Sequence, residues 1–130
     1  MIEVTDTQDL VDLYRDELTH QGRLSEVPKD LYRQMARLYT RLDDECNALK
    51  SEDPGSEESE NSRRRALKVR RLCDDIQHIR MQKVVFLAIR EHHSGESEDR
   101  DLPPVEAKMY ASVRNVMREA SLLLDMDVRE

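Results

Sequence analysis

The amino-acid sequence predicts an all-α fold, a helical bundle of about four helices with a long central third helix. Residues that favour helices dominate, and the 130 residues include only 3 Gly and 4 Pro. Apolar residues recur at spacings of three and four, as in amphipathic helices. No stretch shows the alternation of a β-strand. The length suits one domain, and we expect residues 1–125 to form it.

The first helix has clear start and stop signals. We expect it to run from about Thr7 to Thr19, because Thr5 or Asp6 can cap it and Asp9 can complete a capping box. Gln21-Gly22 is a stop signal. The predicted apolar stripe consists of Leu10, Leu13, Tyr14 and Leu18.

The second helix is expected from Pro28, which suits the first turn of a helix, to about Lys50. An acidic segment, residues 51–61, follows and reads as a polar loop. A hairpin centred near residue 59 would bring Cys46 and Cys73 to a similar height, as packed free thiols. The apolar stripe of the second helix is Leu31, Met35, Leu38, Leu42, Cys46 and Leu49.

The third helix, expected from Arg63 to Glu91, is the element around which the chain is organised. It contains no Gly or Pro, and its first half has apolar residues on one face only. From Val84 to Ile89 it is apolar all round, which predicts that protein covers every side of it. The apolar face of the first half is formed by Ala66, Val69, Leu72, Cys73, Ile76 and Ile79.

A second polar loop, residues 92–102, precedes a fourth helix expected from about Pro104 to Asp125. Residues 126–130 read as a polar tail or a linker stub. The apolar set of this helix includes Val105, Met109, Tyr110, Val113, Val116, Met117, Ala120 and Leu122 to Leu124.

Charge is unevenly distributed along the chain. The net charge is −7, yet residues 62–90 hold nine Lys or Arg against two Asp, which leaves −14 for the rest. The negative net charge argues against general nucleic-acid binding, but the positive charge of residues 62–90 allows a local basic patch. A solvated or ion-paired helix face is favoured, because the acidic loop from Glu52 to Glu60 can pair with the same cations. The possible nucleic-acid patch comprises Arg63, Arg64, Arg65, Lys68, Arg70 and Arg71.

The sequence predicts no catalytic residue, no metal site and no cofactor. Asp74 and His78 share a helix face, and His92-His93 lie near Glu91 and Glu96, but no further ligand accompanies either group. No phosphate loop, flanked Ser nucleophile or Cys pair of redox spacing occurs. With 2 Cys and no signal peptide or membrane-spanning run, we expect a cytoplasmic protein.

Four segments follow one another along nearly the whole chain: LVDLYRDEL, LSEVPKDLYRQM, IRMQKVVFLA and LPPVEAKMY. Together they resemble the helical domain of a GINS complex subunit, of the archaeal type related to the eukaryotic Sld-five and Psf-one branch. The most specific piece is Arg80-Met81-Gln82-Lys83-Val84, similar to the Arg–x–x–Lys–aliphatic core of the family's central helix. Val27-Pro28 before Asp30-Leu31-Tyr32 is similar to the family's entry to the second helix.

The resemblance implies a non-enzymatic scaffold in archaeal DNA replication, associated with the nucleoid. Such subunits form a tetramer, as a homo-oligomer or with a sister GINS subunit, that bridges the MCM helicase and a Cdc-forty-five or RecJ-like protein. The family's C-terminal β-rich domain has no counterpart in these 130 residues. Arg80 and Lys83 lie at the margin of the apolar half, where we expect them to anchor a subunit or helix-bundle junction. The predicted subunit contacts are Arg80, Lys83, Val84, Val85, Phe86, Leu87 and Ile89, with Tyr110 and Met117 as weaker choices.

Overall fold

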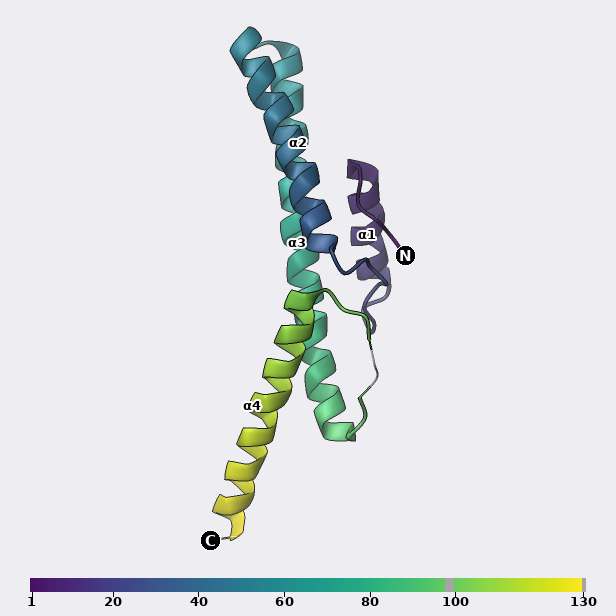
Figure 1. The fold of residues 1–130 in the computed structure, drawn as a ribbon, viewed down its shortest axis with the longest axis vertical. Coiled ribbons are helices and arrows are strands. Elements are labelled where there is room, and N and C mark those ends of the chain that lie inside the picture. The colour runs from purple at the N-terminus through teal and green to yellow at the C-terminus, as the bar shows by residue number, and fades with distance from the viewer. Residues whose placement is uncertain (98–99, 130) are drawn as a thin grey trace.

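Four helices account for nearly all of the fold in the computed structural model, which describes residues 1–97 and 100–129. They are α1 (Thr7–Thr19), α2 (Leu31–Glu52), α3 (Glu57–Ser94) and α4 (Pro104–Arg129). The all-α prediction is confirmed, and α3 is the longest helix with 38 residues. Figure 1 shows an elongated molecule, with α2 along the first half of α3, α1 beside its middle and α4 along its second half.

Helix α1 has the predicted bounds because both halves of its capping box are formed. The Asp6 carboxylate accepts the Asp9 amide at 3.0 Å, and the Asp9 carboxylate accepts the Asp6 amide at 3.1 Å. Helix α2 begins at Leu31, not Pro28, because residues 28–30 form a turn in which the Leu31 amide donates to the Pro28 carbonyl at 3.1 Å. Its predicted stripe is confirmed as buried from Leu31 to Cys46.

The turn between α2 and α3 is shorter than the sequence predicted. Helix α2 continues to Glu52 and α3 begins at Glu57, so most of the predicted loop 51–61 is helical. Ser56 caps α3 by accepting the Ser59 amide at 3.1 Å, and Gly55 supplies the positive φ of 81° in the turn. The acidic run that suggests a loop instead supplies the first turn of α3, where carboxylates interact favourably with the helix dipole.

This shift separates the two cysteines along the hairpin. The Arg70 guanidinium lies 5.7 Å from the centre of the Tyr39 ring, which places these residues opposite each other. Cys46, seven residues closer to the turn than Tyr39, therefore lies opposite residue 63. Cys73 lies ten residues further along α3, roughly 15 Å away along the axis. The expectation of a similar height is wrong, and both thiols are free.

One apolar core joins α1, α2 and the first half of α3. The side chain of Glu17, rather than that of Leu18, continues the buried face of α1, and Leu18 is 44% exposed. The buried residues of this core are Val4, Leu10, Leu13, Val27, Leu31, Met35, Leu38, Leu42, Ala66, Val69 and Ile76.

Helix α4 runs parallel to α3, because the connecting segment returns alongside α3 before α4 begins (Figure 1). Gly95, with a φ of 73°, ends α3, and α4 begins at the predicted Pro104. It continues to Arg129, so residues 126–129, predicted as a polar tail, are helical. Its last turns extend past the end of α3 (Figure 1).

The apolar half of α3 is covered by the chain on some sides only. Val84, Leu87 and Ala88 are buried, whereas Val85 and Ile89 are half-buried. Phe86 is 69% exposed. The expectation that protein covers this segment on every side is therefore not met within one chain.

Candidate functional site: a buried ionic junction

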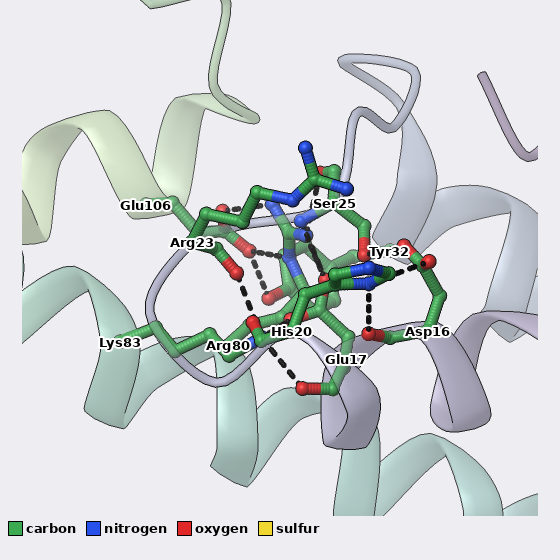
Figure 2. A network of polar contacts seen from close by, with 9 residues as sticks. All are labelled: Asp16, Glu17, His20, Arg23, Ser25, Tyr32, Arg80, Lys83 and Glu106. Atoms are coloured by element: carbon green, nitrogen blue, oxygen red, sulfur yellow. Dashed lines mark hydrogen bonds and ion pairs between the residues drawn. The ribbon is translucent and has the colours of Figure 1, made fainter.

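Arg80 of α3 lies at the point where all four helices meet, and its side chain is 0% exposed. Its Nε and Nη2 donate to the two carboxylate oxygens of Glu106 in α4, each at 2.8 Å. Its Nη1 donates to Glu17 Oε1 in α1 at 2.8 Å and to the Ser25 carbonyl at 3.0 Å. Figure 2 shows these groups converging. A planar guanidinium suits such a site, because it can bind one carboxylate with a fork and still reach a second.

Lys83, one turn further along α3, forms hydrogen bonds with the end of α1. Its Nζ donates to Glu17 Oε2 at 2.6 Å and to the carbonyls of Glu17, His20 and Arg23 at 2.7, 2.9 and 2.8 Å. The last carbonyls of a helix lack partners within the helix and carry partial negative charge. Lys83 therefore fixes where α1 ends and where the following link begins.

The Glu17 carboxylate of the junction is held in its charged form. Burial raises the pKa of Glu17, but hydrogen bonds from Lys83 and Ser25 and the charge of Arg80 outweigh it, so the pKa lies below its usual value. The Tyr32 hydroxyl of α2 donates to Glu106. Burial, followed by this carboxylate, raises the pKa of Tyr32. Burial lowers the pKa of Arg80, and its bonds to Glu106 and the charge of Glu17 more than reverse this, so Arg80 stays a cation.

The charged side chains of the junction bind one another, which suits a structural role, and a pocket of about 690 Å³ borders Ser25, Arg80 and Lys83. Two cations face two carboxylates, and Ser25 donates its amide to Glu17 at 2.9 Å. Next to it, the Ser25 hydroxyl donates to Asp16, and His20 Nδ1 lies 3.1 Å from the same carboxylate. A serine nucleophile needs the imidazole itself as its base. This arrangement therefore does not activate Ser25.

A second polar cluster fixes the connection between α3 and α4. Glu91 accepts a hydrogen bond from Arg100 at 2.9 Å and one from the Tyr110 hydroxyl at 2.6 Å. Arg114 reaches the same hydroxyl at 2.8 Å. The hydrogen bond from Arg100, followed by that from Tyr110, keeps the pKa of Glu91 low despite partial burial. Glu91 is thus an ion-pair partner, and the described residues contain no cluster of metal-ligand type.

Several predicted subunit contacts are covered within one chain. Arg80, Val84 and Leu87 are buried by their own chain, and Lys83 bonds within it, so the two cations anchor the helix bundle of the single chain. Tyr110 and Met117 are half-buried. Of the predicted set, Phe86 is the residue that remains largely accessible.

The six cations of the basic patch are all exposed on α3. Arg63 lies 3.9 Å from Glu60, and Arg70 lies over the Tyr39 ring. Arg64, Arg65, Lys68 and Arg71 make no ion pair with any residue that the structure describes. The acidic segment 52–60 therefore neutralises little of the patch.

Sequence reasoning missed the acidic half of the junction. Glu17 lies four residues after Leu13 on the buried face of α1, and Glu106 lies four residues before Tyr110 on α4. A carboxylate in a buried stripe requires a cationic partner. The position of each glutamate on a buried face could therefore have indicated a buried ion pair. The sequence does not indicate that Arg80 is the partner.

Comparisons of the chain with models of protein families, with curated proteins and with solved structures found no match. Among the helices of residues 1–97 and 100–129, none combines the length and apolar character that a membrane span requires.

We expect stability to fall in acid because of Glu17. Its pKa is lowered in the folded state, so its contribution is complete above the unfolded value of 4.5 and is lost as pH falls through the folded value. Denaturant unfolding measured from neutral pH to pH 3 should show the free energy of unfolding decreasing below about pH 4.5, by up to about 1.4 kcal/mol per pH unit for each extra proton bound. Glu17→Gln should reduce this slope, and Glu45→Gln, on an exposed site, should not. Equal slopes in both variants would contradict the assignment.

Proposed function

We propose that this chain is a non-enzymatic scaffold subunit of the GINS type, acting in DNA replication by assembling with partner helices. In this proposal it forms a homo-oligomer or joins a sister GINS subunit, and the assembly bridges the MCM helicase and a Cdc-forty-five or RecJ-like protein. The observation that carries the proposal is that the four segments of the resemblance meet at one place in the fold.

Each segment contributes to the ionic junction. The first segment supplies Glu17, the second supplies Ser25 and Tyr32, the third Arg80 with Lys83, and the last Glu106. Residues up to 74 positions apart in sequence are thus joined by direct bonds. The motifs therefore share one structural task, the positioning of α1 and α4 on α3, which a scaffold requires and which needs no substrate.

An uncovered apolar surface on α4 supports assembly. Val105, Val116 and Leu123 are all more than half exposed, and their spacing places them on one helix face. Leu122, Leu124 and Met126, in the last turns of α4, are also exposed. We name these six residues the α4 apolar surface. Exposed large apolar side chains, gathered mostly near one end of a helix on a charged protein, are typical of an interface with another chain.

Light scattering on the purified chain across a dilution series tests the assembly. We expect a mass of a dimer or a tetramer that persists into the micromolar range, because buried apolar helix faces give stable contacts. A well-folded monomer would exclude the homomeric form and leave a subunit that needs a sister chain.

Mixing with purified MCM helicase then tests the bridging role. Co-elution in size-exclusion chromatography is expected for the oligomer. An oligomer that does not bind MCM would contradict the replication role while leaving the assembly intact.

A further inference from the structure

A groove lies between α1 and the first half of α3, away from the ionic junction. It has a volume of about 460 Å³, and Tyr14, Leu67 and Leu72 form its apolar part. Tyr14 and Leu72 are half-buried, whereas Leu67 is 52% exposed. An exposed leucine next to two partly covered apolar side chains leaves room for one further apolar group.

Cations surround this apolar part. Arg64 and Arg71 lie three residues before and four residues after Leu67, so they flank it on the same helix face, and Lys68 lines the groove beside them. These three cations make no ion pair with any residue of 1–97 and 100–129, and Asp75 is the carboxylate in the lining. The groove thus carries uncompensated positive charge around an apolar centre, on a protein whose net charge is −7.

We propose that this groove binds an acidic segment of a partner protein, which places one apolar side chain against Leu67, Tyr14 and Leu72. Carboxylates of the segment pair with Arg64, Lys68 and Arg71. This docking surface lies outside the proposed assembly through α4 and does not depend on it.

The apolar centre favours a peptide over a nucleic acid. Phosphate binding needs only clustered cations and would use Arg63 and Arg65 as well as the three groove cations. It would leave Leu67 in water. A peptide with one apolar side chain between acidic residues covers the leucine and neutralises the cations together, as helix-in-groove and electrostatically steered contacts do. The groove admits few side chains, so we expect weak, salt-sensitive binding.

Fluorescence anisotropy with a labelled synthetic peptide tests the proposal. The probe is about 12 residues long and carries a single Leu flanked by Asp and Glu on both sides. At about 50 mM salt we expect saturable binding that weakens strongly at about 300 mM, because screening shortens the range of the charges. The same peptide with its Leu replaced by Ser should bind about tenfold more weakly.

Variants of the chain separate the peptide from a nucleic acid. Leu67→Ser and Arg64→Glu should each weaken peptide binding about tenfold or more, with an unchanged circular dichroism spectrum. Arg65→Glu is the matched control, because it makes the same charge change at the neighbouring position outside the groove lining, and it should have a much smaller effect. Absence of peptide binding, or Leu67→Ser without effect, would overturn the proposal. Tight binding of single-stranded DNA that Arg64→Glu and Arg65→Glu weaken equally would assign the patch to phosphate instead.

Discussion

Replacing Arg80 with Met is expected to lower the free energy of unfolding by about 3–5 kcal/mol, the cost of removing one partner from a buried ion pair. The side chain is fully buried and binds Glu17 and Glu106 at 2.8 Å. Met fills much of the same space but leaves Glu106 with only the Tyr32 hydroxyl as a partner. Urea unfolding at neutral pH measures the loss, and Arg33→Met, on an exposed site, is the control with an expected change near zero.

The pH dependence of this loss separates an electrostatic cause from a packing cause. Without Arg80, Glu17 loses one of the groups that lower its pKa, so this lowering should be smaller in the variant. Protonation of Glu17 then costs the variant less stability, and the deficit relative to the original protein should shrink as pH falls toward 4. A deficit that stays constant with pH would show that lost packing alone is responsible.

A combined substitution tests whether the buried charges of the junction increase the stability of the fold. Changing Arg80 to Met together with Glu17 and Glu106 to Leu removes the three most deeply buried charges together and leaves Lys83. Such replacements are often neutral or stabilising, since desolvation of the ions no longer opposes folding. Lys83 would still hold the carbonyl oxygens at the end of α1. We expect the combined variant to regain much of the stability that Arg80→Met loses.

The helices were predictable from the sequence because their signals are local. The capping box of Asp6 and Asp9 and the spacing of Leu31, Met35 and Leu38 depend on neighbours within one or two turns. The turn at residues 53–56 was misplaced because the same acidic residues suit a solvated loop and the first turn of a helix. In the structure Ser56 caps α3, so the acidic residues after it are helical. The sequence does not single out Ser56 as the cap, because other serines lie nearby.

The ionic junction was only half predictable, because its bonds span large separations. Arg80 and Lys83 attract notice as cations beside an apolar run, but Glu17 is 63 residues from Arg80 and Glu106 is 26 residues away. Periodicity describes one helix at a time and cannot say which helices touch. The parallel course of α4 along α3 depends in turn on the returning connection, in which Arg100 bonds to Glu91.

Leu123→Asp is expected to weaken the proposed assembly by on the order of 100-fold or more, because it exchanges a buried apolar side chain for a charge that lacks a partner. Within one chain Leu123 is 64% exposed, so the stability of the monomer should change by less than about 0.5 kcal/mol. This separation makes it a cleaner probe than Leu87→Asp, which would disturb a residue already buried in its own chain.

The matched control for Leu123→Asp is Ala107→Asp, which adds the same charge on an exposed position of α4 on the opposite face. Light scattering across a dilution series should show the Leu123→Asp chain as a folded monomer at concentrations where the control keeps its full mass. Two variants with the same mass as the original oligomer would exclude the α4 apolar surface. Phe86→Asp would then test the exposed side of α3, since Phe86 is the largest apolar side chain left uncovered there.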